Sequence, residues 1–441
     1  MGAQDTICAL ASGPPPSAIA VVRVSGPAVP DICGRLLASG VPEPRRAVLT
    51  RITDSGGAEI DHGLACFSPA PHSYTGEHTL ELYLHGGPAV IAHALDALTA
   101  LPGVRLAEAG EFTRRAFEAG KLDLTEAEGV ADLIEAETLG QKAQALRQLS
   151  GGLSDTYNEW RDELTGLLAL VEVMVDFPDE GDVDAGAASP VRGRIESLMA
   201  EVEAALGDGG IGERIRDGFR IAIVGPPNAG KSSILNRLAR REAAIVTDIA
   251  GTTRDVVEVR LVLGGQVVWI ADTAGLRETE DVVEAEGVRR AKRAAAEADL
   301  RIHVIDAEDP SPPPGPVLAQ DIVVFNKADL RFPLLAPDGA LPVSAKTGEG
   351  LDRLESSISG FVSQRAASVE APVITRARHR EKLTRGLAAL KAARDAMDQD
   401  LGFELVAEDL RLAIREMQSI VGEIGVEDVL GAVFSRFCIG K

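Results

Sequence analysis

Between positions 220 and 232 the chain reads Arg220-Ile-Ala-Ile-Val-Gly225-Pro-Pro-Asn-Ala-Gly230-Lys231-Ser232. The apolar run predicts a buried strand, and a loop with the spacing G-x-x-x-x-G-K-S leads from it into a helix expected over Ile234 to Leu238. Backbone N–H groups of such a loop, and the start of the helix after it, offer positive dipoles to phosphate groups. Lys231 adds a full charge, and the Ser232 hydroxyl suits Mg²⁺. The stretch therefore predicts an α/β domain that binds a nucleoside phosphate.

Two later segments are expected on the γ-phosphate side of this site. Asp272-Thr-Ala-Gly275 follows another apolar run, so that Asp272 can hold a magnesium-bound water and Gly275 can donate its N–H to the γ-phosphate. Thr252 or Thr253 can reach the magnesium from a loop that orders only when a triphosphate is bound. These residues predict a site that distinguishes triphosphate from diphosphate.

The base is expected to lie against two further motifs, Asn326-Lys327-Ala328-Asp329 and Ser344-Ala345-Lys346. The Asp329 carboxylate can accept hydrogen bonds from guanine N1 and N2, which adenine does not offer. An adenine would leave this carboxylate unmatched, at a cost of roughly three to four decades in discrimination. Because the motifs occur in this order along one chain, they predict a GTP site.

Two positions differ from the small signalling GTPases and bear on hydrolysis. Leu276 stands where those enzymes carry the glutamine that orients the attacking water. Glu284 is the candidate base in its place, although a solvated helix carboxylate is an alternative interpretation. Asn228, inside the phosphate loop, could bind a monovalent cation together with carbonyls of the loop from Thr247 to Gly251. Such an ion would act as an arginine finger does, an effect of about three to five decades.

Length and composition limit the remaining possibilities. The 441 residues exceed one core and predict two or three domains. Neither an apolar run of about 18 residues nor a signal segment is present, so we expect a cytoplasmic protein without membrane contact. The four scattered cysteines argue against a disulfide framework and a zinc site. The net charge of −22 means that any nucleic acid must meet a local basic patch or be held by a partner.

The pattern of residues predicts a multidomain chain. Residues 1–120 combine short β-rich runs, at Ala18 to Val24 and Thr79 to Leu84, with Gly/Pro turns and one helix, which indicates an α+β domain. Apolar residues at helical spacing fill 121–216 and return in 370–441, on both sides of an α/β region at 217–369. Within that α/β region the apolar runs Val267 to Ala271, Leu300 to Ile305 and Ile322 to Phe325 predict further strands. We therefore expect an α/β P-loop domain inserted into an α-helical bundle domain.

The most basic stretch comprises Arg376, Arg378, His379, Arg380 and Lys382. Contact with RNA or with a partner protein would explain it, and so would a solvated start of a helix.

Several segments together resemble one family. They are Asn228, Ile245-Val-Thr-Asp-Ile-Ala-Gly-Thr-Thr-Arg-Asp255, Asp272-Thr-Ala-Gly-Leu-Arg277, Ala20-Val-Val-Arg-Val-Ser-Gly26, Tyr74-Thr-Gly-Glu77, His85-Gly-Gly87, Gly110-Glu-Phe-Thr-Arg-Arg-Ala-Phe117 and Phe437-Cys-Ile-Gly-Lys441. They resemble the MnmE (TrmE) family of tRNA-modification GTPases, within the TrmE-Era-EngA-like P-loop GTPase superfamily. The similarity extends over nearly the whole chain.

The resemblance implies a function as well as a fold. It implies an N-terminal domain that binds a reduced folate (a tetrahydrofolate derivative) and forms a homodimer, a helical domain and an inserted G domain. Hydrolysis of GTP would be stimulated by K⁺. With an MnmG-type partner that carries FAD, the chain would place a carboxymethylaminomethyl or aminomethyl group on C5 of the wobble uridine of tRNA.

The resemblance also assigns residues to these roles. K⁺ would be held by Asn228, Thr247, Ile249 and Thr252, Mg²⁺ by Ser232 and Thr253, and folate by Arg23, Glu81, Lys121 and Lys441. Catalytic roles are expected for Glu284, Lys231, Asn228, Thr253 and Gly275. With the motifs, the resemblance places GTP contacts on Asn228, Ala229, Gly230, Lys231, Ser232, Ser233, Thr247, Asp248, Thr252, Thr253, Asp272, Thr273, Ala274, Gly275, Asn326, Lys327, Asp329, Ser344, Ala345 and Lys346.

Alternatives stay open on the residues alone. Arg23 and Glu81 could be ordinary surface charges on strands, and Cys438 could be either a packed thiol or a reactive one. A ribosome-assembly or RNA-binding GTPase would carry a basic G-x-x-G loop near its end, where Leu383 to Lys441 is expected to be helical instead. A folate-dependent one-carbon transferase regulated by a G domain would share the folate and GTP sites.

Overall fold

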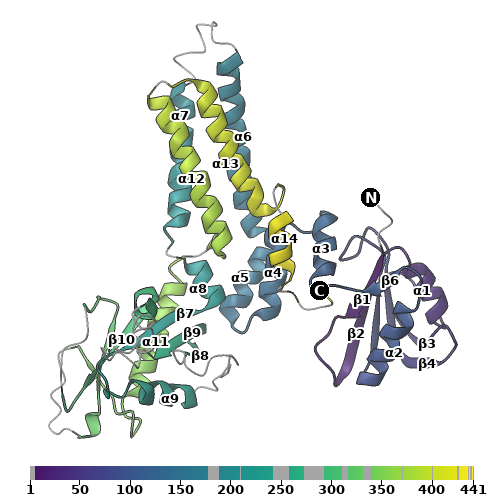
Figure 1. Cartoon of the computed structure of the whole chain (residues 1–441), viewed down its shortest axis with the longest axis horizontal. Helices are drawn as coiled ribbons and strands as arrows, with labels where there is room; N and C mark the ends of the chain where they lie inside the picture. Colours follow the sequence, from purple (N-terminus) through teal and green to yellow (C-terminus); the bar gives the residue numbers. More distant parts are fainter. Residues whose placement is uncertain are drawn as a thin grey trace, which may run out of the picture. The chain divides into compact units, whose positions relative to one another are not determined.

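The computed structural model describes residues 5–176, 188–208, 210–241, 258–272, 293–309, 316–330, 339–369, 371–399, 401–424, 427–435, 437 and 440. The chain folds into two compact units. The first comprises Met1–Ala131, Gln148–Gly166 and Arg411–Lys441, and the second comprises Asp132–Arg147 and Leu167–Leu410. Each unit combines segments that are far apart in the sequence, as the colours of Figure 1 show.

The first unit contains a six-stranded sheet in the order β3-β4-β5-β2-β1-β6. Its strands are β1 (Thr6–Leu10), β2 (Ser17–Ser25), β3 (Ala47–Thr53), β4 (Glu59–Ser68), β5 (Thr79–Gly86) and β6 (Val104–Leu106). All neighbours are antiparallel except β1 and β6. The predicted strand runs at Ala18 to Val24 and Thr79 to Leu84 are confirmed as β2 and β5.

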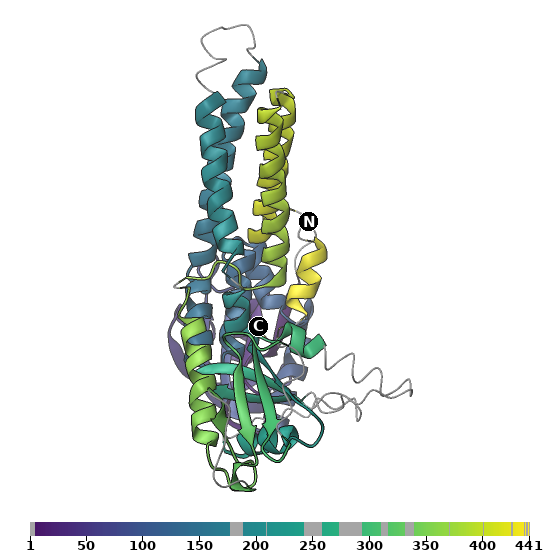
Figure 2. The ribbon, with the colours of Figure 1, turned by 90° about the vertical axis from the view of Figure 1, so that its left-hand side faces the viewer.

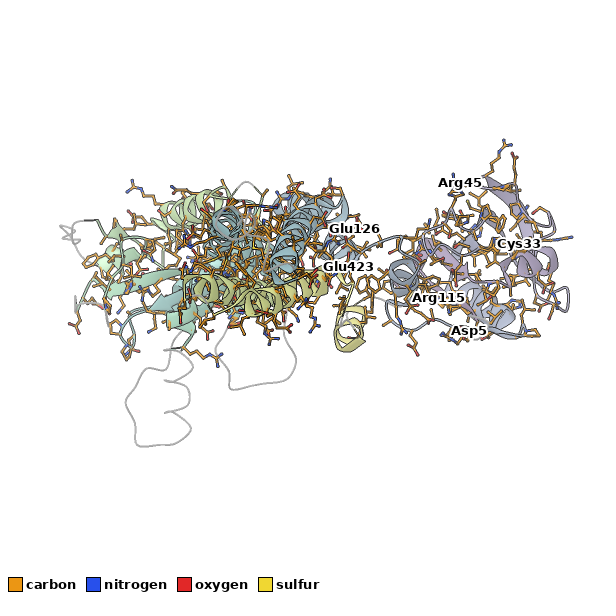
Figure 3. The ribbon with its side chains drawn as sticks, turned by 90° about the horizontal axis from the view of Figure 1, so that it is seen from above. Asp5, Cys33, Arg45, Arg115, Glu126 and Glu423 are labelled. Atoms are coloured by element: carbon orange, nitrogen blue, oxygen red, sulfur yellow. The ribbon has the colours of Figure 1, made fainter. Side chains whose placement is uncertain are left out.

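Alternation along the strands decides which face of this sheet is covered. Leu80, Leu82 and Leu84 of β5 are buried, while Glu81 between them points to the other face. Helices α1 (Val29–Leu36) and α2 (Pro88–Thr99) pack on the apolar face. Cys33 of α1 belongs to that core (Figure 3), and burial raises the pKa of its thiol to about 12.

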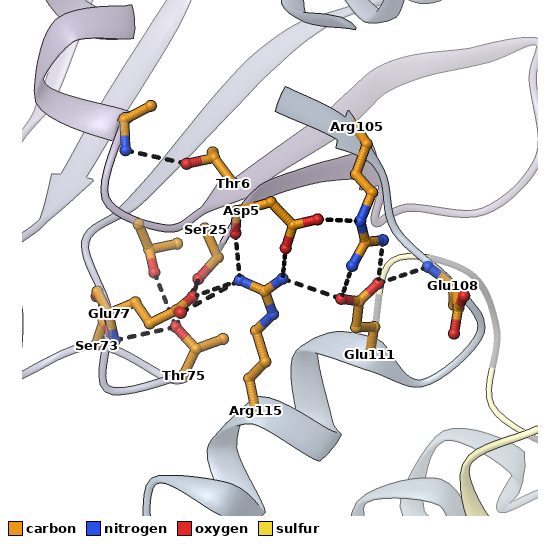
Figure 4. Close-up of polar contacts among 12 residues, drawn as sticks. Asp5, Thr6, Ser25, Ser73, Thr75, Glu77, Arg105, Glu108, Glu111 and Arg115 are labelled. Carbon is orange, nitrogen blue, oxygen red and sulfur yellow. Dashed lines mark hydrogen bonds and ion pairs between the residues drawn. The ribbon is translucent and has the colours of Figure 1, made fainter. Parts of the chain in front are cut away.

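An ion-pair network ties α3 (Glu111–Glu118) to the start of β1 (Figure 4). The Arg115 guanidinium is buried and donates to the Asp5 carbonyl at 2.8 Å, to Glu111 at 3.0 Å and to both oxygens of Glu77 at 3.2 Å. Arg105 donates to Glu111 and to Asp5 from the opposite side. The network therefore joins charged side chains that are far apart in the sequence.

Helices complete the first unit. Residues of α4 (Leu124–Glu135) and of α14 (Glu427–Phe434) form an aromatic cluster with Phe117, Phe434 and Phe437. Gly422 has a φ of +95°, and a Cβ there would lie 2.8 Å from the Phe117 ring, so the chain can turn at this point only with glycine. Helix α6 (Gly152–Asp176) carries Tyr157 and Trp160 in an edge-to-face pair.

The second unit contains the other six-stranded sheet, in the order β12-β11-β10-β7-β9-β8. Its strands are β7 (Phe219–Val224), β8 (Glu258–Leu263), β9 (Gln266–Asp272), β10 (Leu300–Asp306), β11 (Ile322–Asn326) and β12 (Leu341–Pro342). Only β8 runs antiparallel to its neighbour. The four strands predicted from apolar runs are β7, β9, β10 and β11. Helices α9 (Lys231–Arg241) and α11 (Leu351–Ala366) pack against this sheet.

The remaining helices of the second unit pack on one another. Helices α7 (Ala188–Leu206) and α12 (Ala377–Asp398) lie side by side in both Figure 1 and Figure 2. Val191, Ile195, Leu198 and Val202 of α7 are buried, and this spacing places them on one helix face. The unit also contains most of α5 (Leu139–Leu149), all of α8 (Ile211–Asp217) and the first part of α13 (Phe403–Val421), as far as Leu410. Along the described ranges, no helix combines the length and the apolar character that crossing a membrane requires.

The basic stretch at the start of α12 is not a solvated helix end, which corrects one of the two sequence interpretations. Arg376 donates to Asp132 at 2.6 Å, and Arg380 donates to Glu213 at 3.1 Å and to the last carbonyl of α7. His379 is fully buried. These charges are paired inside the unit because carboxylates from other helices fold against them.

Candidate active site

The parallel strands of the second unit end at one edge of the sheet, and each predicted motif begins there. Gly225 follows β7, and Asp272 is the last residue of β9. Asp306 ends β10, Asn326 ends β11, and Ser344 comes just after β12. Ligands of open α/β sheets bind outside these carboxyl ends. The topology therefore brings together groups that the sequence separates by more than 100 residues.

The phosphate loop has a backbone that requires small residues. Gly230 has a φ of +90°, and a Cβ there would lie 2.2 Å from Nδ2 of Asn326. Asn228 also takes the left-handed conformation, with a φ of 64°, and asparagine tolerates this better than most residues. The Lys231 ammonium is buried and donates to the carbonyls of Gly225 at 3.0 Å and Pro226 at 2.8 Å. Burial lowers the pKa of Lys231, although the nearby Asp272 carboxylate opposes the shift.

Two hard oxygen groups meet beside the loop. The Ser232 hydroxyl donates to Oδ2 of Asp272, whose side chain is buried at the end of β9. A hydroxyl and a carboxylate with this placement match the oxygen ligands and water partners that Mg²⁺ prefers. These residues fit the magnesium site expected from the sequence.

The base-reading motifs are joined to the phosphate loop through Asn326. Its buried amide donates from Nδ2 to the Ala229 carbonyl at 2.7 Å, and its Oδ1 accepts from the Ala345 N–H at 3.1 Å. The Ser344 hydroxyl donates to Oδ1 of Asp329 at 2.6 Å. The Ser344 hydroxyl, at the start of the loop after β12, therefore holds Asp329, and Asp329 itself is exposed. This hydrogen bond orients the carboxylate that is expected to read guanine.

Two residues at this edge were not among the predicted contacts. Asp306 accepts from Nζ of Lys327 at 2.6 Å, and this hydrogen bond raises the pKa of Lys327, whose φ of 61° is left-handed. Arg237 of α9 donates to the carbonyls of Ala345 and Lys346. An acid at the end of an apolar run could have indicated Asp306. No sequence signal distinguishes Arg237 from a surface arginine, because its acceptors are backbone atoms.

The other predicted nucleotide residues divide into two groups. Ser233 and Lys346 are exposed on α9 and on the loop after β12. A second group lies outside the described residues: Thr247, Asp248, Ile249, Thr252, Thr253, Thr273, Ala274, Gly275 and Glu284. The proposed folate residue Lys441 and the thiol of Cys438 also lie outside them.

The first unit brings Arg23 and Glu81 together across β2 and β5. They are register partners and form a double contact, at 2.9 and 3.0 Å, with the Tyr83 hydroxyl donating to the other Glu81 oxygen at 2.8 Å. The Arg23 guanidinium also lies over the rings of Tyr74 and Phe112, at 5.6 and 5.7 Å from their centroids. This is a charged and aromatic surface rather than a pair of isolated strand charges.

The remaining folate candidates approach the same surface. A Cβ at Gly76, in the loop that carries Tyr74, would lie 3.5 Å from Cε of Lys121, so the lysine stem passes over this loop. Arg23 donates to the carbonyl of Gly440 at 3.5 Å, next to the last residue of the chain. Of the four predicted folate positions, Arg23 and Glu81 are therefore paired, Lys121 lies beside the loop that carries Tyr74, and the Gly440 carbonyl approaches Arg23.

Comparison with known proteins agrees with this architecture. A family model described as "GTP-binding protein TrmE N-terminus" matches residues 6–121, and one described as "MnmE helical domain" matches residues 124–438. The chain is 76% identical to the tRNA modification GTPase MnmE of Hyphomonas neptunium over the full length of both. It is 52% identical to the protein of the same name from Parvibaculum lavamentivorans, over 99% of this chain and 100% of the relative.

Among solved structures, a variant of Aquifex aeolicus Era bound to GDP and aluminium fluoride is 26% identical, covering 41% of this chain and 66% of its own, with a TM-score of 0.24. The family assignment comes from the full-length relatives and the family models. The predicted fold class is confirmed: an N-terminal α+β part, a helical part and an α/β GTPase domain.

Proposed function

The chain belongs to the MnmE family of tRNA modification GTPases, and on this premise we propose that it couples K⁺-dependent GTP hydrolysis to modification of the wobble uridine. A flavin-containing MnmG-type partner and a reduced folate as one-carbon source complete the reaction. The product is a carboxymethylaminomethyl or aminomethyl group on C5 of the base. The observation that carries the proposal is the junction at Asn326, which unites the phosphate loop with the guanine loop.

In this proposal the nucleotide binds across the sheet edge of the second unit. Lys231 gives up its hydrogen bonds to its own loop carbonyls and turns its ammonium to the β- and γ-phosphates. Ser232 and Asp272 hold the magnesium side, and Asp329 reads guanine N1 and N2. When bound, Mg²⁺ neutralises charge that develops on the phosphates. Glu284, in the segment after Asp272, orients the attacking water, since Leu276 cannot.

Asn228 is assigned to the K⁺ site together with Thr247, Ile249 and Thr252. Its left-handed backbone, with a φ of 64°, supports this role, because asparagine adopts this conformation more readily than most residues and brings an amide oxygen to the loop. A monovalent cation there would supply the charge that other GTPases obtain from an arginine finger.

The reduced folate is assigned to the surface around Arg23 and Glu81 in the first unit. A carboxylate can accept hydrogen bonds from the amino face of a pterin, and Arg23, Lys121 and Lys441 can meet the anionic tail. The Tyr74 ring beside the Arg23 guanidinium supports the proposal, because it offers a flat apolar partner to a pterin ring. Homodimerisation through the N-terminal domain belongs to the same proposal.

The partner is proposed to hold much of the tRNA. The chain has a net charge of −22, and Arg376 and Arg380 at the start of α12 are already paired within the second unit. An acidic subunit in which two arginines of the most basic stretch are paired internally contributes little sequence-independent attraction to a phosphate backbone.

Two measurements test the proposal. The steady-state GTPase rate should rise strongly in KCl over NaCl at matched ionic strength, and Asn228→Ala should remove this difference. Equal rates in the two salts would refute the cation mechanism.

Deletion of the coding sequence should remove the C5 substituent from the wobble uridine, measured by mass spectrometry of tRNA nucleosides. Unchanged nucleosides in the deletion strain would favour a folate-dependent one-carbon transferase instead.

A further inference from the structure

We propose that Arg237 is a positioning residue that couples the phosphate loop to guanine recognition. The inference rests on the GTP site proposed above and adds a residue that the motifs do not contain. Arg237 lies on α9, the helix that begins at Lys231. Its Nε donates to the Ala345 carbonyl at 3.1 Å, and its terminal nitrogen donates to the Lys346 carbonyl at 2.6 Å. One planar guanidinium thus donates hydrogen bonds to two successive backbone carbonyls.

These two carbonyls belong to the loop whose first residue, Ser344, holds Asp329. Ser344 holds this loop by two hydrogen bonds. Its hydroxyl donates to Asp329, and its carbonyl accepts from the Gly348 N–H at 2.8 Å. The same hydroxyl accepts from the Thr347 N–H at 3.1 Å. The carbonyls of Ala345 and Lys346 lie between these bonds, so Arg237 fixes the middle of the loop and Ser344 fixes Asp329.

The connection runs through a rigid element. Arg237 lies six positions after Lys231, which is about 9 Å along an α-helix. Asn326 forms a second bridge between the phosphate loop and the guanine loop, at Ala229 and at the N–H of Ala345. Residue 345 is therefore held from both sides, its N–H by Asn326 and its carbonyl by Arg237. Guanine selectivity then depends on α9 as well as on the two base-reading motifs.

The choice of arginine follows from the geometry. A guanidinium presents several N–H donors in a fixed plane, whereas a lysine ammonium is a single point on a flexible stem. A lysine at this position would have to meet both carbonyls from one nitrogen atom, without the fixed spacing that two guanidinium nitrogens provide. The side chain is partly buried, so water competes only in part for these bonds.

The test is the ratio of kcat/KM for GTP to kcat/KM for ITP, measured on the full chain. ITP lacks the 2-amino group that Asp329 reads, so the ratio reports how well Asp329 is placed. Arg237→Ala should lower the ratio by about tenfold, since a hydrogen bond from a charged group contributes on that order. The loss should appear mainly as a higher KM for GTP with little change in kcat. Arg237→Lys should give an intermediate ratio.

Arg241 provides the matched control. It is an arginine on the same helix that pairs with Asp352 of α11 and makes no described bond to the guanine loop. Arg241→Ala should keep the wild-type ratio. If Arg237→Ala and Arg237→Lys both keep it as well, Arg237 is only a structural contact and the inference is overturned. If the wild-type ratio is itself close to one, Asp329 does not read guanine N2, and the guanine site and the inference are overturned together.

Discussion

Replacing Arg115 by methionine should destabilise the first unit by about 3 kcal/mol. The guanidinium is 8% exposed and contacts three carboxylates, those of Asp5, Glu77 and Glu111 (Figure 4). Removing one partner of a buried ion pair costs about 3–5 kcal/mol, because it leaves an uncompensated buried charge. Asp5 and Glu111 would keep Arg105, whereas Glu77 would keep only the Ser25 hydroxyl, at 2.7 Å, among its side-chain donors described here. One carboxylate left under-paired places the cost at the lower end of that range.

Hydrogen exchange read by mass spectrometry on the full chain would measure this, using peptides that cover β1 and β2. A loss of about 3 kcal/mol speeds exchange through global opening of the unit by roughly 100-fold. Arg114→Met is the matched control, since Arg114 is the neighbouring residue, is half exposed and pairs only with Glu118 among the described contacts. An exposed i,i+4 pair contributes about 0.3–0.5 kcal/mol. Equal exchange rates in the two variants would refute the assigned role of the network.

Three further outcomes are expected. Acidification should weaken the first unit, because the hydrogen bond from Arg105 lowers the pKa of Asp5 below its value in the unfolded chain. The resulting stability is present above the unfolded pKa and is lost as the pH falls through the folded pKa. Thermal melts between pH 6 and pH 3 would show this loss. Gly230→Ala should abolish GDP binding by calorimetry with the circular dichroism unchanged, since its Cβ would lie 2.2 Å from Nδ2 of Asn326. Ser232→Ala should raise the Mg²⁺ concentration needed for half-maximal GTPase activity by roughly tenfold, and an unchanged requirement would exclude Ser232 as a ligand.

The nucleotide motifs could be predicted because their signal is local. Gly225 to Ser232 needs an apolar strand, small residues and a helix start within 13 positions, and each requirement is written in neighbouring residues. The strands of the second unit were predicted for the same reason, since buried parallel strands are continuous apolar runs. The role of Asn326 as a bridge could not be predicted, because its acceptor is a backbone carbonyl 97 positions earlier.

The pairing of charged side chains was the property of the chain that the sequence predicted least well. Arg376 and Arg380 resemble a surface patch when only neighbouring residues are considered. Their partners Asp132 and Glu213 lie 244 and 167 positions away, so only the folded helices decide that these charges are neutralised internally. The same holds for Arg23, whose partner on the adjacent strand turns a strand charge into part of a built surface.

The sequence by itself determined which chemistry the chain carries: a phosphate loop, a guanine reader and the family to which they belong. These depend on short-range spacing and on backbone conformations that only certain residues adopt. The tertiary structure decided which groups meet, including Arg237 with the guanine loop and Arg115 with three carboxylates. Such contacts join side chains to backbone atoms or to charges far along the chain, and their partners exist in space only after the sheets and helices have packed.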